Sequence, residues 1–296
     1  MTNCRSVRAG SSASWKLRSK LSDMAETSRR VPEAVFRNRT LSEGQRVVAE
    51  ESAIALSYGG STEAVMMATP GDLEDFAIGF SLSEGIIESI DEVISVEIEP
   101  ASGGIDLQIS LKDDVDRALR VRRRAKAGPV GCGLCGVESI EEALKPAADV
   151  SGIALRLTAG DISDAMAALS ANQPLNAETR AVHAAGFYIP GRGMIAVRED
   201  VGRHNALDKL IGHLARNGIS GSDGAVIMTS RLSVELIQKT AKLGSGVLIG
   251  ISAPTALAID MAARSGMTLV ALARGQDFEI FTGEDRIRMG AEANAA

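Results

Sequence analysis

Two cysteines, Cys132 and Cys135, stand three positions apart in the glycine-rich stretch GPVGCGLCGVES at residues 128–139. A Cys-x-x-Cys pair can hold a metal ion, form a disulfide or supply nucleophilic thiolates. Glycine beside each cysteine gives the backbone wide conformational freedom and offers the sulfur atoms little to pack against. This composition favours exposed thiols on a mobile loop, which could receive an atom at one place and deliver it at another, over an inert surface loop.

The spacing of possible metal ligands argues against a zinc site. A structural zinc ion needs four ligands, but the chain has three cysteines and three histidines and no second Cys-x-x-Cys. Zinc deaminases use His-x-Glu followed by Pro-Cys-x-x-Cys, whereas His183 precedes Ala-Ala-Gly and Gly131 precedes Cys132. We therefore expect no metal site, and a zinc-dependent hydrolase is a less favoured hypothesis.

Basic residues lead directly into the cysteine stretch. They are Arg117, Arg120, Arg122, Arg123, Arg124 and Lys126. They could form the solvated face of a helix, or they could provide a positive field that lowers the pKa of the thiols and attracts an anion. The sequence leaves both interpretations open.

A second concentration of charge, REDVGRHN at residues 198–205, precedes a helical pattern. Its side chains could form an ion network that holds a turn, or they could form a site. His204 is expected just before an amphipathic helix, which favours a functional role for it. His183, in a strand, is ambiguous. His213 lies off the apolar face of its helix, and we expect no role for it.

The last hundred residues predict a parallel sheet. Apolar strand patterns at residues 225–228, 247–251 and 268–273 alternate with helical patterns, and parallel neighbours require such crossovers. Ligands of these sheets gather beyond the carboxyl ends of the strands, where the chain places residues 229–231, 252–255 and 274–275. Hydroxyls, a guanidinium group and helix starts expected at Ser230 and at residues 252–254 indicate a phosphate-like anion. Ordinary helix capping by the same hydroxyls is the alternative.

The region from Glu50 onward predicts a smaller α/β part. Strands are indicated at residues 51–57, 64–68, 93–98 and 106–111, with a hairpin turn at 102–104. A helix is expected between Thr69 and Gly85. The remaining elements are helices at 138–144, 158–172 and 205–217, and paired strands at 182–188 and 194–198.

Composition narrows the function classes. The chain has 296 residues and a formal net charge of −6, so it lacks the basic excess of a general nucleic-acid binder. Three cysteines do not make a disulfide scaffold and fit a reducing compartment. No apolar run reaches the roughly 18 residues that cross a bilayer, so no membrane span is expected. The first thirty residues are serine-rich and basic, which predicts a disordered tail.

Several motifs occur together in a fixed order. They are Thr69-Pro-Gly-Asp-Leu-Glu-Asp75, Gly79-Phe80 with Ser83-Glu-Gly-Ile-Ile87, Cys132-Gly-Leu-Cys-Gly136, REDVGRHNALDK at residues 198–209, and Ser252-Ala-Pro-Thr255. With them, the chain resembles the formate dehydrogenase accessory sulfurtransferases, the FdhD family, over about residues 50–282. The long block and the order of the set carry this resemblance, which the Cys-x-x-Cys alone would not.

The resemblance implies a cytoplasmic sulfurtransferase of the carrier type. Such proteins accept persulfide sulfur from an L-cysteine desulfurase. They pass it to their cargo, the molybdenum bis(molybdopterin guanine dinucleotide) cofactor, before its insertion into formate dehydrogenase. The resemblance also implies a homodimer that binds a guanine nucleotide such as GDP, and a three-layer α/β/α main domain with a cytidine-deaminase-like fold but no zinc site. A non-catalytic chaperone for the cofactor is the alternative.

The resemblance also assigns roles to individual residues. Cys132 matches the persulfide-bearing cysteine, and Cys135 matches a second loop cysteine. The segment that matches the one associated with the cofactor consists of Leu272, Ala273, Arg274, Gly275, Gln276 and Asp277, and the strand-end argument adds Ser252 and Thr255. One departure is Tyr58-Gly59-Gly60, where family members often have Asn-Gly after the first strand.

Together these features predict an α/β protein with four parts. The parts are a disordered tail at residues 1–30, a smaller N-terminal α/β part at 31–126, a mobile Cys-x-x-Cys loop at 127–138 and a C-terminal cytidine-deaminase-like domain at 139–290.

Overall fold

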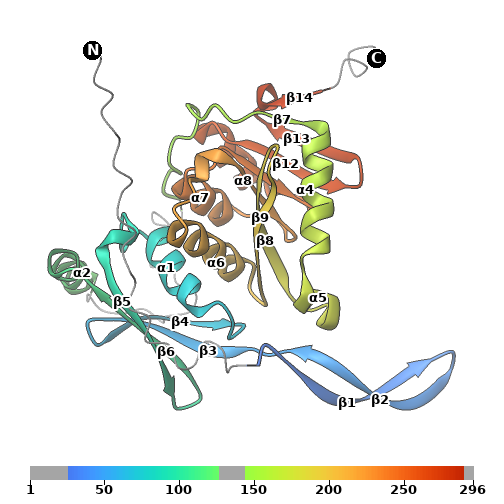
Figure 1. The fold of residues 1–296 in the computed structure, drawn as a ribbon, viewed down its shortest axis with the longest axis horizontal. Helices are drawn as coiled ribbons and strands as arrows, with labels where there is room; N and C mark the ends of the chain where they lie inside the picture. The colour runs from blue at the N-terminus through green and yellow to red at the C-terminus, as the bar shows by residue number, and fades with distance from the viewer. Residues whose placement is uncertain (1–25, 127–143, 290–296) are drawn as a thin grey trace, which may run out of the picture.

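The computed structural model describes residues 26–126 and 144–289 (Figure 1). In these ranges the chain forms a six-stranded sheet with helices on both faces, a four-stranded sheet and a projecting hairpin. The predicted α/β class is confirmed. None of the described helices is long and apolar enough to cross a membrane.

The six-stranded sheet has the order β13-β12-β11-β10-β8-β9. Its strands are β8 (His183–Ile189), β9 (Gly193–Asp200), β10 (Ala225–Met228), β11 (Val247–Gly250), β12 (Thr268–Arg274) and β13 (Asp277–Thr282). The central strands β10, β11 and β12 are parallel, as predicted. β8 pairs antiparallel with β9 and β10, and β13, which adds to the predicted strands, pairs antiparallel with β12. The sheet is therefore mixed, with a parallel centre.

Helices cover both faces of this sheet because its strands carry apolar side chains on both sides. In β10, Val226 and Met228 belong to the core under α6 (Arg203–Arg216), α7 (Val234–Leu243) and α8 (Ala256–Ser265). Ala225 and Ile227 belong to the core under α4 (Ala159–Ala171), which α5 (Pro174–Thr179) follows. The helices and the sheet thus form three layers, and the cytidine-deaminase-like arrangement stays a prediction.

The N-terminal part is built on a second sheet with the order β4-β3-β6-β5. Its elements are β3 (Ser52–Tyr58), β4 (Ser61–Ala68), α1 (Leu73–Ser83), the 3-10 turn η1 (Ile90–Glu92), β5 (Val93–Ala101), β6 (Gly104–Leu111) and α2 (Asp113–Lys126). The predicted strands and helix α1 are all present. Phe76 and Phe80 of α1 pack with Ile54 and Leu56 on one face of the sheet.

Two glycines let α1 lie directly on α6 and so join the two sheets. A Cβ atom on Gly79 would overlap the Asp208 carbonyl, and one on Gly212 would overlap the Asp75 carbonyl. Backbones this close leave no room for any side chain at the crossing. Leu82 of α1 packs against both the core of the four-stranded sheet and the core under α6.

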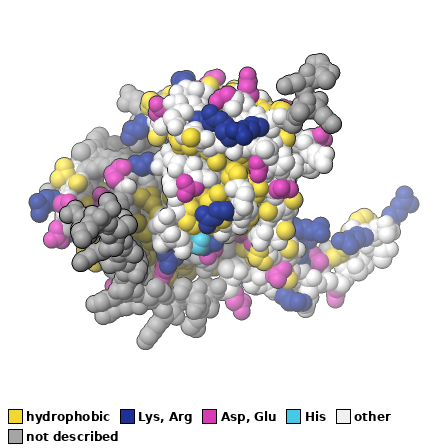
Figure 2. All heavy atoms as spheres, turned by 45° about the horizontal axis from the view of Figure 1, so that its top comes forward, with side chains coloured by type: hydrophobic (Ala, Val, Ile, Leu, Met, Phe, Trp, Pro, Cys, Tyr) yellow, Lys and Arg dark blue, Asp and Glu magenta, His cyan; other side chains and the backbone are white. Residues whose placement is uncertain are grey.

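A third, two-stranded sheet lies at the start of the described chain and corrects the predicted tail. β1 (Ser28–Arg37) and β2 (Thr40–Ala49) form an antiparallel hairpin, here called the arm. Residues 28–30 therefore begin a strand and do not belong to a tail. The arm projects from the body (Figure 1), and basic side chains lie along it at the right of Figure 2. Its strands lack a continuous apolar alternation because most of its side chains are exposed.

Short elements complete the described chain. β7 (Leu157–Thr158) pairs parallel with β14 (Ile287–Arg288), and the 3-10 turns η2 (Gly221–Asp223) and η3 (Glu284–Arg286) lie between larger elements. Buried Arg286 donates to the carbonyls of Val150, Ser151 and Gly266. These bonds hold residues 150–151 against the end of α8. The helix expected at residues 138–144 lies almost wholly outside the described residues.

Two helices begin later than predicted. The N-cap of α7 is Ser233 and not Ser230, and the N-cap of α8 is Thr255 instead of residues 252–254. The chain stays extended past both strands because Leu232 and Pro254 form an isolated parallel bridge. The extended segments lengthen the ledge beyond the carboxyl ends of β10 and β11.

Candidate functional site

The segments expected to bind a ligand meet at one edge of the six-stranded sheet. Backbone hydrogen bonds connect the ends of β10 and β11, from Leu232 to the Ala253 carbonyl (3.2 Å) and from Thr255 to the Leu232 carbonyl (3.0 Å). The end of β12 joins them through a longer bond from the Leu272 amide to the Ser252 carbonyl at 3.4 Å. The structure thus brings residues 229–232, 252–255 and 272–274 side by side, which we call the carboxyl edge.

Residues 272–277 form the turn from β12 into β13. Leu272 has a φ of 53°, a left-handed conformation that is costly for a branched side chain. Arg274 pairs with Asp277 across the turn, and Gly275 supplies its positive φ of 60°. Leu272 is half-buried and Ala273 is buried, whereas Arg274, Gly275, Gln276 and Asp277 are exposed. The turn therefore presents its polar residues to solvent. The left-handed conformation of Leu272 coincides with an irregularity in the pairing of β12 with β13.

The two hydroxyl residues of the carboxyl edge differ in what they do. Thr255 caps α8 by accepting from the Ala258 amide at 3.3 Å, which is the capping role considered as the alternative to ligand binding. The Ser252 hydroxyl makes no hydrogen bond to any described residue and is half-buried. Arg274 donates through Nε to the Ile251 carbonyl at 3.4 Å, and its side chain is exposed. Ser252 and the outer nitrogens of Arg274 are therefore free to bind an anion.

His183 lies at the same edge because β8 runs antiparallel to β10, so that its first residue meets the end of β10. Next to it, Thr229 accepts from the Ala184 amide at 2.8 Å. Burial lowers the pKa of His183, and Arg203 lowers it further, against the opposing effect of Asp200. The imidazole is therefore held neutral at neutral pH, a state in which one ring nitrogen donates and the other accepts.

His204 lies in the first turn of α6 and not before the helix. Its Nε2 is 2.9 Å from Glu235 Oε2 and 3.4 Å from Ser233 Oγ at the start of α7. The hydrogen bond from His204 is the main reason why the pKa of Glu235 is lowered to about 2. The carboxylate and the hydroxyl share one ring nitrogen, so this arrangement lacks the geometry of a nucleophilic triad.

Asp200, at the end of β9, is a buried carboxylate with a structural role. It is fully buried and accepts from Lys209 Nζ at 2.6 Å, the Thr69 amide at 3.0 Å and the Gly202 amide at 2.8 Å. Asn205 donates to the same carboxylate at 3.0 Å. All the donors come from the entry to α1 and from α6 or its N-cap. This side chain fixes how the N-terminal part meets the larger sheet, and it is satisfied without a ligand.

The other charges of the REDVGRHN block have separate partners. Glu199 accepts from the Leu175 and Asn176 amides at 2.9 and 2.8 Å, which anchors α5. Arg198 donates to Asp75 of α1 at 2.8 Å and lies 2.6 Å from His213 Nδ1. The block is therefore not one network. Glu199 points to the opposite face of the strand from Arg198 and Asp200, and these two bind different partners.

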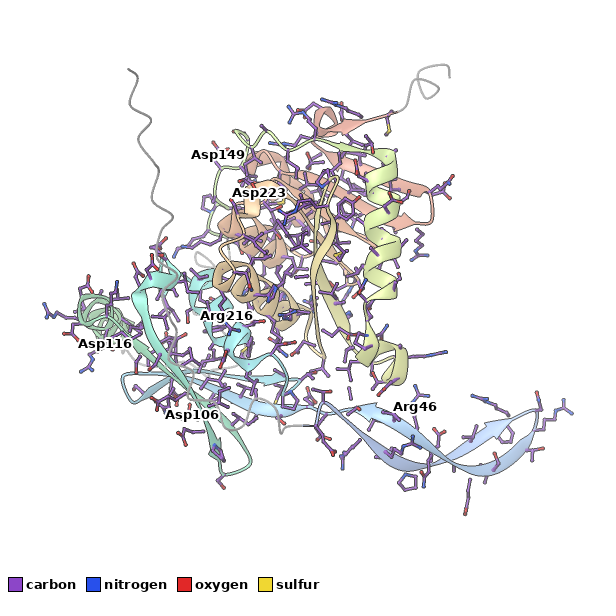
Figure 3. The ribbon with its side chains drawn as sticks, in the orientation of Figure 1. Arg46, Asp106, Asp116, Asp149, Arg216 and Asp223 are labelled. Atoms are coloured by element: carbon purple, nitrogen blue, oxygen red, sulfur yellow. The ribbon has the colours of Figure 1, made fainter. Side chains whose placement is uncertain are left out.

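Asp75 collects three basic groups, one of which is His213. Arg216 binds the carboxylate at 2.6 Å (Figure 3), and His213 Nδ1 lies 3.6 Å from it. Burial alone would raise the pKa of Asp75, but the neighbouring His213, Arg216 and Arg198 lower it to about 2. His213 thus has a structural contact that its position off the apolar face did not indicate.

A buried ion cluster at the centre of the molecule was not evident from the sequence. Lys239 of α7 bonds to Asp208 of α6 at 2.9 Å, to Glu84 at 2.8 Å and to the Ser83 hydroxyl at 2.8 Å. Burial opposes the charge on Lys239, but Asp208 and Glu84 outweigh it and raise the pKa of the lysine. A lysine placed among apolar helix positions is the signal that could have revealed this cluster.

A cleft of about 550 Å³ runs along β9 at the opposite border of the sheet from β13. Met194, Ile195, Ala196 and Val197 line it in succession, together with residues of α5 and the entry to α1. None of the residues expected to bind the cofactor lines this cleft. The carboxyl edge is therefore distinct from the cleft beside β9.

Cys132 and Cys135 lie outside the described residues, whereas the basic run before them lies in α2. On α2, Arg120 pairs with Asp116 at 2.8 Å. Among the described residues, no group of three or more His, Cys, Asp or Glu side chains is placed to hold a metal ion.

Comparisons with known proteins agree over nearly the whole described chain. The model of the FdhD/NarQ family matches residues 49–288. A protein of Agrobacterium fabrum named "Sulfur carrier protein FdhD" is 58% identical over 88% of this chain and 96% of its own length. A Brucella abortus protein of the same name is 53% identical over 88% of this chain and 97% of its own. The solved structure of a formate dehydrogenase accessory protein from Desulfotalea psychrophila has a TM-score of 0.69 and 27% identity, covering 89% of this chain and all of that one.

Proposed function

The chain belongs to the FdhD/NarQ family, and from this membership we propose that it is a sulfur carrier protein that serves formate dehydrogenase. The observation that carries the proposal is the 58% identity to a protein named sulfur carrier over 96% of that protein's length. Identity at this level extends across both sheets and the segments between them. The similarity to the solved structure of a formate dehydrogenase accessory protein supports the proposal that this chain serves formate dehydrogenase.

The sulfur-bearing group in this proposal is the Cys132 thiolate. It attacks the terminal sulfur of a persulfide on an L-cysteine desulfurase, so that a new sulfur–sulfur bond forms on Cys132 and the desulfurase cysteine leaves as a thiolate. The product is a persulfide on Cys132, which makes the protein a sulfurtransferase of the carrier type. Cys135 is the second loop cysteine of this scheme.

The cargo in this proposal is the molybdenum bis(molybdopterin guanine dinucleotide) cofactor, which receives the sulfur. Its phosphates and GDP-like moiety would lie along the carboxyl edge, at Ser252, Thr255 and residues 272–277. The uncommitted Ser252 hydroxyl and the exposed Arg274 guanidinium support this position, because both can donate to an anionic oxygen. Arg231, also exposed at this edge, adds positive charge.

The neutral imidazole of His183 suits the same ledge. It can donate to or accept from a polar group of the cargo without adding charge next to Arg203. We also propose that the protein acts in the cytoplasm and as a homodimer.

Mass spectrometry after incubation with an L-cysteine desulfurase and L-cysteine tests the sulfur-carrying step. We expect a mass increase of one sulfur atom on the wild-type protein, mapped to Cys132, and none on Cys132→Ala. Cys135→Ala is the matched control, since it removes a thiol of the same loop. An adduct that persists in Cys132→Ala and is lost in Cys135→Ala would contradict the assignment.

A chaperone that binds the cofactor without carrying sulfur is the second candidate. It is favoured by the carboxyl edge itself, where the Ser252 hydroxyl and the Arg274 guanidinium could bind an anion whether or not the cysteines carry sulfur. Formate dehydrogenase activity in a deletion strain separates the two functions. Full restoration by Cys132→Ala would favour the chaperone, whereas loss of activity with retained GDP binding would favour the carrier.

A further inference from the structure

The outer edge of β9 is an open border of the six-stranded sheet. β9 is the last strand in the order of this sheet, and no described strand pairs with its outer side. Alternate backbone N–H and C=O groups of β9 therefore point to that side without a strand partner. Such an edge is a ready template for a further strand.

The cleft of about 550 Å³ follows this edge. Residues 194–199 line it in succession. Because successive side chains of a strand point to opposite faces of the sheet, a cleft that contacts all of them runs along the edge and not over one face. Six residues of a strand span about 20 Å, so the cleft is long enough for one extended segment of similar length.

The cleft lies between the helices of the two sheet faces. Glu199 accepts from the Leu175 and Asn176 amides of α5 on one face of β9. Arg198, the preceding residue, reaches His213 of α6 on the opposite face. Figure 1 shows α5 and α6 on either side of the β8–β9 hairpin. An extended segment beside β9 would therefore direct one row of side chains towards α5 and the other row towards α6 and the entry to α1.

The two sides of the cleft differ in polarity. On the side of α5, Leu175 and Met194 are apolar, and Met194 packs against the core under α4. On the other side, Asp72 is exposed at the entry to α1. Arg198 Nε lies 3.5 Å from Asp72 but is closer to Asp75, at 2.8 Å, so Asp72 has only a distant counterion in Arg198. A segment with one apolar and one basic row of side chains would complement this cleft.

A stretch with this pattern precedes the described residues of the same chain. Residues 15–21 read WKLRSKL, so that every second residue is basic and the others are apolar or serine. In an extended conformation, such an alternation separates the two kinds of side chain into two rows. Residues 1–25 carry five basic residues and one acidic residue, whereas the whole chain has a net charge of −6. Both the alternation and the charge match the cleft.

Thr27 fixes where this stretch joins the described fold. Thr27 itself lines the cleft, and its carbonyl accepts from the Glu50 amide at 2.8 Å. Its Cγ2 is 3.0 Å from the position that a Cβ atom would take on Gly71, next to Asp72. Residues 22–26 connect residues 15–21 to Thr27, and five residues span at most about 18 Å. The stretch is therefore tethered close to the outer edge of β9.

We propose that residues 15–21 pair with the outer edge of β9 as an additional strand, with their apolar side chains towards α5 and their basic side chains towards Asp72. Main-chain hydrogen bonds would supply the affinity, and the two rows of side chains would fix the register. The edge is then closed to pairing with other chains. This contact is independent of sulfur transfer, because it uses no residue of the carboxyl edge or of the Cys-x-x-Cys stretch.

Trp15 is the only tryptophan of the chain, so tryptophan fluorescence of the full chain reports on this contact. In the wild type, the emission should lie at shorter wavelength, and acrylamide should quench it less, than in a synthetic peptide of residues 1–25. A triple variant should return both values to those of the peptide, because its reversed charges would face Asp72; its changes are Lys16→Glu, Arg18→Glu and Lys20→Glu.

The matched control for the triple variant changes charge in the same segment but outside residues 15–21. Arg5→Glu with Arg8→Glu should leave the emission and the quenching of Trp15 as they are in the wild type. All of these substitutions lie outside the described fold, so circular dichroism and Tm should show that its core is intact. The emission should also be unchanged on dilution, because the contact lies within one chain.

Hydrogen exchange locates the contact on β9. Amides of residues 193–200 that face the cleft should exchange at least about tenfold more slowly in the wild type than in the triple variant. Amides of β13, at the opposite border of the sheet, should exchange equally in both proteins. A Trp15 as accessible as in the peptide, equal exchange of residues 193–200 in the two proteins, or loss of the emission shift on dilution would each overturn the proposal.

Discussion

At the scale of single residues, the carboxyl edge separates side chains that serve the fold from side chains that are free. Thr255 is used to cap α8, whereas the Ser252 hydroxyl makes no bond in the described chain. Arg274 uses one nitrogen on the Ile251 carbonyl and directs the rest of its guanidinium to solvent. The sequence predicted all three residues as ligand-binding candidates. The structure shows that Ser252 and Arg274 have hydrogen-bonding groups that no described residue uses.

Arg274→Ala should weaken the binding of GDP. Loss of a charge-assisted hydrogen bond typically costs about 1.5–3 kcal/mol, which corresponds to at least about a tenfold rise in Kd by calorimetry. Arg264→Ala is the matched control, because Arg264 is also exposed but lies in the last turn of α8, away from the carboxyl edge. An unchanged affinity for Arg274→Ala would remove this residue from the site.

Asp75 should make folding stability sensitive to acid. Its pKa is lowered from 3.8 to about 2 in the folded protein, so its contribution is present above the unfolded pKa and is lost as the pH falls from about 4 to 2. A shift of this size corresponds to about 2 kcal/mol. Urea unfolding at pH 6 and at pH 3 should show a smaller pH-dependent loss of stability in Asp75→Asn than in the wild type. Equal losses in the two proteins would contradict the prediction.

At the scale of elements, the crossing of α1 and α6 decides how the two sheets are joined. Gly79 and Gly212 let the helix backbones touch, and Arg198, Arg216 and His213 surround Asp75 nearby. The motifs that contain these residues are recognisable in the sequence. That the motifs form one contact between two helices follows only from the fold.

Gly212→Ala should destabilise the protein, although alanine is the better helix former. The gain in helix propensity is about 1 kcal/mol, but the added methyl group would overlap the Asp75 carbonyl, and overpacking of this kind costs about 1–3 kcal/mol or more. Gly160→Ala in α4 is the control, since the nearest atom to its added Cβ is the Thr158 hydroxyl at 3.6 Å. Thermal unfolding should show a lower Tm for Gly212→Ala and an equal or higher Tm for Gly160→Ala.

At the scale of the whole molecule, the two large sheets share one interior. Leu82 contacts the cores on both sides, and Lys239 connects α7 to Glu84 at the end of α1 and to Asp208 of α6. The contrast between the net charge of −6 of the whole chain and the basic arm is also a feature of the whole molecule. Both follow from how the elements are arranged and from no single segment.

The described chain should therefore unfold as one unit. Disruption of either sheet exposes the α1–α6 contact and leaves the charges of Asp208 and Lys239 without partners, which is costly in a buried site. Differential scanning calorimetry should give a single transition whose van't Hoff and calorimetric enthalpies agree. Two resolved transitions would show that the sheets unfold independently.

The sequence by itself determined the family, the α/β class, the parallel centre of the large sheet and the strands of the small one. These follow from local order: apolar periodicity, glycine and proline at element ends, and motifs that lie within short stretches of chain. The arm escaped notice because most of its side chains are exposed and show no continuous apolar alternation. β13 was missed although its Phe278 and Ile280 alternate with the exposed Asp277 and Glu279. Cys132 and Cys135 stay a prediction from the sequence.

Only the tertiary structure decided which residues meet across long distances in the chain. The residues of the REDVGRHN block have separate partners, and His213 lies near the Asp75 carboxylate. His183 lies beside the end of β10 because β8 pairs antiparallel with β10. The tertiary structure also showed that Gly79 and Gly212 allow the close contact of α1 and α6 that joins the two sheets. Such contacts depend on the relative position of packed elements, and no local pattern of residues encodes that position directly.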